Sequence, residues 1–323
     1  MIVGVSTAMR RAAALAERYA RTRLPILVVG ATGTGKELLA QHIHERSGRP
    51  GPLVDVNCAA LPHDMVESLL FGHQRGAFTG AVATSVGHVE RSDGGTLFLD
   101  ELASLVPEGQ GKLLRVLETA EVQRLGAGAK RRVDLRVVSA VQDDIGSALE
   151  RGRFRRDLYQ RVAGVVIELP PLTQRPEDVV PLAKHFAGLL GRRLEPGVER
   201  VLLNYSWPGN VRELRTAIER AGELAENGIL PPAAVAEAIE LGALASPTTA
   251  SVIGDEAALL ATCKTQGWHA GRITTTLGIS RTTLHRRLRE LGISLRRTKK
   301  YHFVPVCPEQ SGTMAQTERT ATA

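Results

Sequence analysis

PILVVGATGTGKELL, from Pro25 to Leu39, is the segment that carries most information about the fold of this chain. An apolar run over 26–29 leads into a glycine-rich turn, and a helix-forming segment begins after Lys36. A strand, a glycine loop and a helix N-terminus in this order make an anion cradle, because backbone N–H groups wrap a phosphate while the helix dipole and the lysine favour negative charge. The pattern GxxxxGK therefore predicts a phosphate-binding loop. Its candidate binding residues are Gly30, Ala31, Thr32, Gly33, Thr34, Gly35, Lys36 and Glu37.

One position departs from the usual form of such a loop. The residue after Lys36 is Glu37, where a serine or threonine hydroxyl would ordinarily ligate Mg²⁺. A glycine-rich turn between a strand and a helix, followed by an unrelated lysine, would give the same letters. The strand–loop–helix order favours the phosphate-binding interpretation over this alternative.

The composition limits the class of protein. With 323 residues, 43% of them apolar, the chain has room for two or three domains. No apolar run is long enough for a membrane span, and the N-terminus lacks the order of a secretion signal, so we expect a cytoplasmic protein with no membrane partner. Cys58, Cys263 and Cys307 are isolated, which predicts neither a disulfide framework nor a zinc site. The net charge of +7 indicates a polyanion partner if the charge is concentrated.

Beyond the loop, apolar runs alternate with intervals of helix length. The runs are Leu53–Asn57, Gly95–Asp100, Leu135–Ala140 and Val165–Leu169. This alternation is typical of a parallel sheet covered by helices on both faces, so the expected fold class is α/β. Ligands of such sheets bind beyond the carboxyl ends of the strands. We therefore expect Asn57, Asp100 and Glu101 to lie near the phosphate loop.

Two acids stand where the run GGTLFLDE ends. Phosphoryl transfer needs a carboxylate to hold Mg²⁺ and a second group to orient the attacking water. Asp100 suits the first role and is the candidate metal ligand, and Glu101 suits the second. The alternative is an aspartate that caps a helix from Leu102 onward. The phosphate loop in the same sheet favours the catalytic interpretation.

From Pro170 the pattern changes to proline-punctuated helical segments. These cover 179–192, 196–203, 211–225 and 232–241 and predict a small all-helical subdomain. We expect an α/β core over 1–170, a helical lid over 171–241, a linker over 242–254, an all-α unit over 255–295 and a basic, disordered tail over 296–323.

The all-α unit contains GRITTTLGISRTTLHRRLRELGI, from Gly271 to Ile293. Apolar residues keep helical spacing across a break at Gly278, and two short helices around a glycine turn predict a helix-turn-helix whose second helix enters the major groove of DNA. The alternative is a solvated basic helix face; the surplus of arginine and lysine over one acid, Glu290, favours double-stranded DNA. The candidate contact residues are Ser280, Arg281, Thr282, His285, Arg286 and Arg289.

A loop is predicted in FGHQRGAFTGA, from Phe71 to Ala81. Gly76 and Gly80 bracket three residues with an aromatic at their centre, so the chain there can turn sharply and protrude. Such an aromatic is either tucked back into the core or held out to grip a partner.

In full, GAFTGA together with the phosphate loop closely resembles the AAA+ ATPases that activate sigma-54 RNA polymerase, the bacterial enhancer-binding proteins. Further family blocks are NCAALP (57–62), ESLLFGH (67–73), GGTLFLDEL (94–102), KLLRVLE (112–118) and WPGNVREL (207–214). The resemblance covers about Val3 to Ile293 and implies an AAA+ P-loop sheet with helices on both faces, a helical lid and a Fis-type helix-turn-helix, with ATP and Mg²⁺ as cofactors. The sigma-factor contact it implies is Gly76, Ala77, Phe78, Thr79, Gly80 and Ala81.

The resemblance also implies roles for single residues. Glu37 is usual at its position in this family, so Mg²⁺ would depend on Asp100, phosphate oxygens and waters. Asn57 would hold Glu101 toward or away from the attacking water according to the nucleotide state. The remaining catalytic candidates that match the family are Lys36, the arginine fingers Arg155 and Arg161, and the sensor arginine Arg212.

Local patterns bear on these assignments. A solvated basic run is the alternative for Arg155 and Arg161, whose spacing would place them on different faces of one helix. An N-cap at Asn210 with a capping box from Glu213 would put Arg212 in a helix's first turn, where a cation is suited to meet a bound anion.

Two further stretches complete the comparison with the family. Where the family reads Ala-Ala-Thr-Asn after the fourth strand, this chain has Ser139-Ala140-Val141-Gln142, so the polar sensor would be Val141 or Gln142. The segment LGAGAKRR (125–132) would be a second pore-facing loop.

Together these features predict an ATP-driven activator that binds an upstream DNA site and remodels sigma-54 RNA polymerase from a closed to an open complex. The family resemblance implies a ring, most simply a hexamer. The chain begins almost at the ATPase core, so we expect control by a separate regulatory protein or by expression level. Two alternatives are a regulator of the same architecture that works with the housekeeping polymerase and another AAA+ machine such as a helicase loader; the intact GAFTGA argues against both.

Overall fold

The computed structural model describes residues 2–142, 145–225, 228–245, 256–266, 270–277, 284, 287–288, 294–297 and 303–306. The chain divides into two compact units, Met1–His185 with Gly209–Arg212, and Phe186–Pro208 with Glu213–Ala323. The six candidate DNA contacts, Ser280, Arg281, Thr282, His285, Arg286 and Arg289, lie outside the described residues.

The first unit is built on a five-stranded parallel sheet with the order β2-β5-β8-β1-β9. The strands are β1 (Ile26–Val29), β2 (Leu53–Asn57), β5 (Thr96–Asp100), β8 (Arg136–Val141) and β9 (Val165–Glu168). Every residue of β8 is buried, as a strand covered on both faces requires. The predicted α/β fold with a parallel sheet is confirmed.

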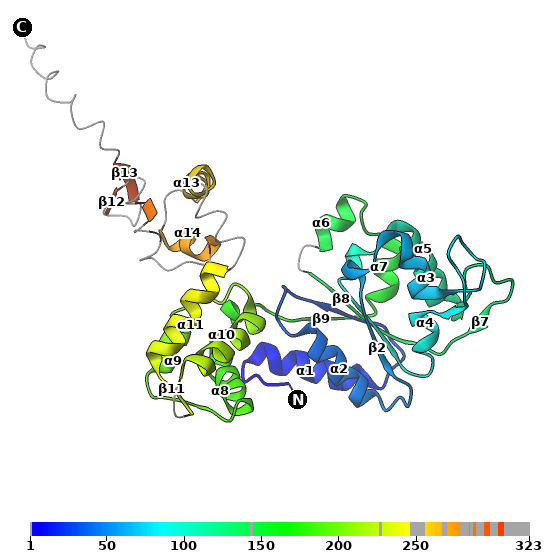
Figure 1. Ribbon diagram of the computed structural model, residues 1–323, viewed down its shortest axis with the longest axis horizontal. Coiled ribbons are helices and arrows are strands. Elements are labelled where there is room, and N and C mark those ends of the chain that lie inside the picture. The colour runs from blue at the N-terminus through cyan, green and yellow to red at the C-terminus, as the bar shows by residue number, and fades with distance from the viewer. Residues whose placement is uncertain are drawn as a thin grey trace, which may run out of the picture. The chain divides into compact units, whose positions relative to one another are not determined.

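Helices cover both faces of this sheet (Figure 1). On one face, α1 (Thr7–Ala20) and α2 (Lys36–Ser47) pack against a core that includes Ile26, Val28 and Phe98. On the other face, α3 (Val66–Phe71), α4 (His88–Arg91), α5 (Pro107–Thr119), α6 (Ile145–Glu150) and α7 (Arg156–Val162) lie over a core that includes Leu27, Leu97 and Leu99. Successive residues of β1 and β5 thus point to opposite faces, because side chains alternate along a strand.

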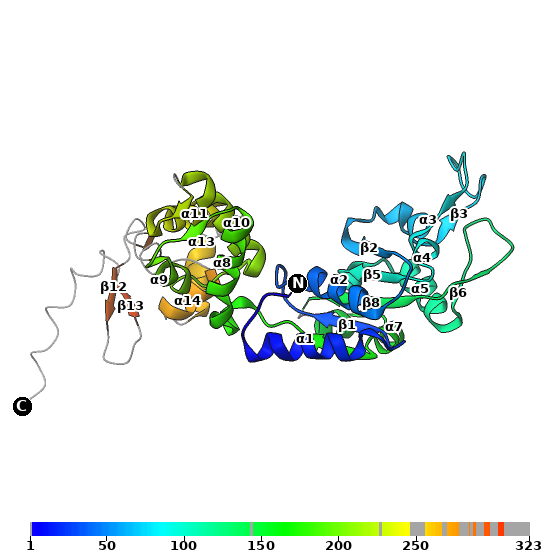
Figure 2. The same cartoon turned by 90° about the horizontal axis from the view of Figure 1, so that it is seen from below.

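Two hairpins extend from the first unit (Figure 2). In one, β3 (Gly72–His73) pairs antiparallel with β4 (Ser85–Val86). In the other, β6 (Glu121–Val122) pairs antiparallel with β7 (Arg131–Arg132). A bridge between His73 and Leu125 joins the two. Short 3₁₀ turns complete the unit: η1 (Cys58–Ala60), η2 (His63–Met65), η3 (Leu102–Ser104), η4 (Leu172–Gln174) and η5 (Pro176–Asp178).

The helices of the predicted lid are α8 (Val179–Leu189), α9 (Val198–Leu203), α10 (Asn210–Leu224) and α11 (Pro232–Ala245). They match the predicted segments to within a few residues. The buried indole of Trp207 donates to the carbonyl of Leu202 (2.8 Å) and so ties the chain before α10 to α9. A short parallel pair, β10 (Arg193–Leu194) with β11 (Ile229–Leu230), was not expected from the sequence.

Toward the C-terminus the structure describes α13 (Glu256–Thr265) and α14 (Ala270–Leu277). The side chains of Ile273, Leu277, Leu284 and Leu288 are buried, in agreement with the predicted helical spacing of apolar residues. Strands β12 (Ser294–Arg297) and β13 (Phe303–Val306) pair antiparallel, so these residues differ from the irregular tail expected there. No helix among the described residues is long and apolar enough to cross a bilayer.

Candidate functional site

The phosphate loop connects β1 to α2, and its backbone requires glycine. Gly33 has a φ of 79° and Gly35 a φ of 105°, both in the left-handed region that residues with a Cβ rarely adopt. A Cβ on Gly33 would lie 2.4 Å from the carbonyl oxygen of Gly209, and one on Gly30 would lie 2.7 Å from that of Leu169. Glycine is therefore required here by close approach of the backbone as well as by φ.

The Lys36 side chain lies inside the loop. It is only 8% exposed, and its Nζ donates to the carbonyls of Gly30 (2.7 Å) and Ala31 (3.2 Å). The Thr34 hydroxyl also donates to the Ala31 carbonyl (2.8 Å). The positive charge is thus held against two backbone carbonyls of the loop, beside the N-terminus of α2, where an anion is favoured.

The start of α10 lies against this loop. The N–H groups of Val211 and Arg212 donate to the Gly33 carbonyl at 2.9 and 3.2 Å. Arg212 is in the first turn of α10, as predicted, and helix α10 begins at Asn210 itself. The carboxylate of Glu213 accepts from the hydroxyl of Tyr205 (2.9 Å), and the capping box between Asn210 and Glu213 stays a prediction.

Asn57 and Asp100 are direct cross-strand partners at the carboxyl ends of β2 and β5. Glu101 follows with a left-handed φ of 51°, and its N–H donates to Oδ1 of Asp100 (2.9 Å). The Asn57 amide oxygen accepts from the N–H groups of Ala59 (3.0 Å) and Ala60 (3.3 Å). Among the described residues no hydrogen bond joins Asn57 to Glu101, whose carboxylate instead faces the amide of Gln142, 3.5 Å away.

Sequence reasoning did not single out Asp55. It lies two residues before Asn57 on β2, and therefore on the same side of the strand. Burial raises the pKa of Asp55, and the nearby carboxylates of Glu37 and Asp100 raise it further. Burial raises the pKa of the Cys58 thiol to about 12, and the nearby carboxylates of Asp100, Glu101 and Asp55 contribute to this shift. The alternation of polar residues in LVDVN is the signal that could have identified Asp55.

The acidic edge fits a magnesium ion bound with a nucleotide. No group of three or more His, Cys, Asp or Glu side chains in the described part of the chain could hold a metal ion by itself. Mg²⁺ bound with phosphates takes only one or two carboxylates and keeps several waters. Asp100, at the carboxyl end of β5 in the sheet that also carries the phosphate loop, is suited to that role.

Arg155 and Arg161 do not share a helix. Arg155 precedes α7 and pairs with Asp157 through Nε (3.0 Å) and Nη2 (2.7 Å). Arg161 is in the last turn of α7, where Nε and Nη2 donate to the Leu117 carbonyl at 3.2 and 2.6 Å. The expectation that they lie on two faces of one helix was wrong, because the helix begins after Arg155. Both side chains are exposed.

The GAFTGA loop is closed at its base by a hydrogen bond from the Gly76 N–H to the Ala81 carbonyl (2.9 Å). Phe78 is 44% exposed, and its ring meets the His73 ring edge-on with centroids 5.0 Å apart. The hydroxyl of Ser68 lies 2.7 Å from Nδ1 of His73 and orients that ring. The aromatic is thus neither buried nor fully held out, but rests on a fixed imidazole.

The second loop packs beside the first. A Cβ on Gly126 would lie 2.9 Å from Cβ of Ala77. Beneath both loops, the buried carboxylate of Glu90 accepts two bonds from Arg124 (2.8 and 2.6 Å) and one from Arg131. These guanidinium groups lower the pKa of Glu90. The Glu90 carboxylate on α4 therefore links Arg124 and Arg131, which lie on either side of the second loop.

Comparison with known proteins shows two family matches along the chain. Residues 2–168 match the Sigma-54 interaction domain, and residues 173–251 match the AAA+ ATPase lid domain.

Relatives with described roles span much of the chain. The Nif-specific regulatory protein of Azotobacter vinelandii is 39% identical over 312 residues, which are 92% of this chain and 60% of that protein. The anaerobic nitric oxide reductase transcription regulator NorR of Salmonella paratyphi B is 48% identical over 232 residues, 69% of this chain and 46% of that protein. The chain thus spans about half to three-fifths of the length of these relatives.

Solved structures share the fold. NtrX from Brucella abortus in complex with ATP has a TM-score of 0.66 and 32% identity, covering 90% of this chain and 69% of that one. A Thermotoga maritima RuvB Holliday junction branch migration motor has a TM-score of 0.53 at 17% identity, a likeness of fold alone.

Proposed function

The chain belongs to the sigma-54-dependent transcription regulators, and on this premise we propose that it is an ATP-hydrolysing activator that converts the closed complex of sigma-54 RNA polymerase into an open one. The observation that carries this proposal is the presence, in one compact unit, of the glycine-forced phosphate loop around Lys36 and the protruding GAFTGA loop. The phosphate loop would supply the energy of ATP hydrolysis, and the GAFTGA loop would contact sigma-54.

ATP and Mg²⁺ are the proposed cofactors. The N–H groups of residues 30–37 and the Lys36 ammonium would bind the phosphates, and Asp100 would hold Mg²⁺, which neutralises charge on the transferred phosphoryl group. Glu101 would orient the attacking water, supported by Gln142 at 3.5 Å. Asn57 lies opposite Asp100 in the strand register. It would hold Glu101 toward or away from the attacking water according to the nucleotide state.

We further propose that the protein acts as a ring, most simply a hexamer. Arg155 and Arg161 are exposed, and each is held in a defined direction by Asp157 or by the Leu117 carbonyl. Side chains so placed are available to the nucleotide of a neighbouring subunit, where a guanidinium would stabilise charge in the transition state. Arg212, beside the phosphate loop through its own backbone, would act within the subunit.

The proposed partners are sigma-54 with its RNA polymerase and double-stranded DNA. Residues 76–81 would contact sigma-54 with Phe78 and Thr79 at the tip. The residues from Ser280 to Arg289 would contact an upstream DNA site, supported by the basic sequence there and by the buried apolar set that includes Ile273 and Leu288.

In-vitro transcription with purified polymerase tests this proposal. We expect ATP-dependent open complexes with the sigma-54 holoenzyme and none with the housekeeping holoenzyme. Open complexes with the housekeeping holoenzyme alone would overturn the proposal. They would support a regulator of the same architecture that works with the housekeeping polymerase.

A further inference from the structure

Three successive carbonyls on the outer side of the phosphate loop are held by donors from distant parts of the chain. The Thr32 carbonyl accepts from Nδ2 of Asn210 (3.0 Å). The Gly33 carbonyl accepts from the N–H groups at 211 and 212. The Thr34 carbonyl accepts from Nη2 of Arg175 (3.0 Å). We call these donors the carbonyl clamp, and the predicted phosphate-binding pattern includes neither Arg175 nor Asn210.

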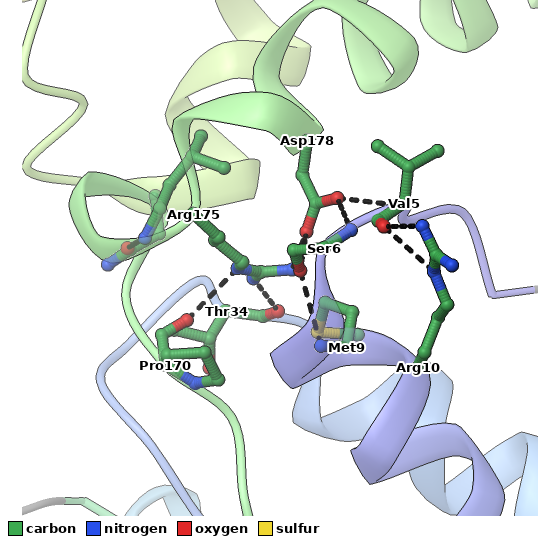
Figure 3. A network of polar contacts seen from close by, with 10 residues as sticks. Val5, Ser6, Met9, Arg10, Thr34, Pro170, Arg175 and Asp178 are labelled. Carbon is green, nitrogen blue, oxygen red and sulfur yellow. Dashed lines mark hydrogen bonds and ion pairs between the residues drawn. The ribbon is translucent and has the colours of Figure 1, made fainter.

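Arg175 is 1% exposed, and each of its three guanidinium nitrogens has a polar contact. Besides the Thr34 carbonyl, Nε donates to the carbonyl of Pro170 (3.1 Å), and Nη1 lies 3.6 Å from Oδ2 of Asp178 (Figure 3). Burial lowers the pKa of Arg175, and Asp178 opposes that shift. One planar group thus joins the phosphate loop to the connection that follows β9.

Asp178 is itself held by the segment before α1. The carboxylate is 0% exposed and accepts from the N–H groups of Val5 (2.6 Å) and Ser6 (2.7 Å) and from the Ser6 hydroxyl (2.7 Å) (Figure 3). The Ser6 hydroxyl also caps α1 by accepting from the N–H of Met9 (3.2 Å). Moving the Asp178 carboxylate away from Arg175 would therefore break several buried hydrogen bonds.

Peptide planarity gives this arrangement its consequence for the ligand. None of the described peptide bonds is cis, and in a trans peptide the C=O and the following N–H point in opposite directions. Holding the Thr34 carbonyl outward therefore turns the N–H of Gly35 inward, and holding the Thr32 carbonyl outward does the same for the N–H of Gly33. Without the clamp, glycines with free φ would sample other orientations.

We propose that Arg175 and Asn210 are positioning residues for nucleotide binding, which act by fixing the direction of the loop's inward N–H groups. The inference rests on the proposed function, since it assumes that the loop binds a nucleotide. A buried ion pair adds little net stability on average, so a role in orienting the loop gives the Arg175–Asp178 pair a reason to be there. The competing view is that the pair only fastens the N-terminal segment to the connection after β9.

Substitutions of Arg175 and Ser6 separate these views. Arg175→Lys keeps the charge but cannot reach Thr34, Pro170 and Asp178 together, whereas Ser6→Ala removes a cap and a bond to Asp178 and leaves the clamp intact. Titration calorimetry with ADP and Mg²⁺ on the full chain, with thermal unfolding of each variant, gives the two readouts. We expect ADP to bind about tenfold more weakly to Arg175→Lys and within about twofold of wild type to Ser6→Ala. Equal affinities for Arg175→Lys and wild type, or equal losses in both variants, would overturn the clamp.

Asn210 provides a second, independent variant. Its φ of 56° is left-handed, so Asn210→Gly removes the amide without backbone strain. We expect ADP affinity to fall several-fold, and wild-type affinity for this variant would contradict the inference. Either of these contradictory results would overturn the clamp without overturning the proposed function. A wild-type chain that binds no ADP would overturn both.

Discussion

Nε2 of Gln142 lies 3.5 Å from Oε1 of Glu101 at the carboxyl edge of the sheet. The two residues follow β8 and β5, which are neighbours in the sheet. Val141, the other candidate for the polar sensor, is 1% exposed and packs in the core. The geometry therefore favours Gln142 as the group that reports on Glu101.

Gln142→Ala should slow ATP hydrolysis without weakening ATP binding. Loss of the amide leaves Glu101 free to turn away from the attacking water, so we expect kcat to fall about tenfold while KM stays within about twofold. Steady-state ATPase assays measure both, with Gln41→Ala on the exposed side of α2 as the control. A rise in KM at unchanged kcat would place Gln142 in binding instead.

Gly33→Ala should abolish nucleotide binding. The left-handed φ alone costs about 1–2 kcal/mol for a residue with a Cβ, and the 2.4 Å approach to the Gly209 carbonyl adds steric overlap. Calorimetry with ADP and a thermal melt check this prediction. Gly146→Ala in α6, where a Cβ meets nothing within 4 Å, should bind ADP normally. Normal binding by Gly33→Ala would show that the loop has another conformation.

Glu90→Gln should destabilise the first unit. The substitution removes the charge from a buried acceptor whose partner Arg124 is 26% exposed, and we expect a loss of about 2 kcal/mol, as for a hydrogen bond between charged groups. Denaturant unfolding measures it. Glu17→Gln is the matched control, because Glu17 is 56% exposed and its contacts to His42 and Arg46 are longer than 3.5 Å; an exposed pair contributes less than about 1 kcal/mol. Similar losses in the two variants would contradict the role given to Glu90.

The same carboxylate predicts the pH dependence of stability. The arginines lower the pKa of Glu90 in the folded state below its ordinary value of 4.5, so the folded form binds a proton less readily than the unfolded form. Its contribution is therefore fully present above pH 4.5 and is lost as the pH falls through the lower, folded value. Denaturant unfolding between neutral and acid pH should show a smaller loss on acidification in Glu90→Gln than in wild type. An identical loss of stability in both proteins would exclude Glu90 as a source of the pH dependence.

Much of the fold follows from local sequence patterns. The apolar run before Gly30 and the run that ends at Asp100 have the length and composition of buried strands, and the glycines between β1 and α2 mark the loop by their freedom at positive φ. The aromatic in GAFTGA stands out because two glycines bracket it. The roles proposed for these residues stay predictions.

The contacts that hold the site depend on tertiary folding. Arg175 meets Thr34 across 141 positions of sequence, and Asp178 meets Ser6 across 172. No periodicity relates such residues, and an Arg and an Asp in a proline-rich connection read locally as solvated charges. Helix α7 begins one residue after Arg155, and a boundary of that kind is the least certain feature of a sequence pattern.

Open-complex formation by Thr79→Ala examines the proposed coupling between ATP hydrolysis and sigma-54 at the contact itself, because the Thr79 side chain is exposed at the tip of the loop. With ATPase activity and sigma-54-dependent open complexes measured on one preparation, we expect ATP hydrolysis within about twofold of wild type and loss of open complexes. Wild-type levels of open complex would contradict the proposed coupling, since the energy of hydrolysis would then reach the polymerase by another route.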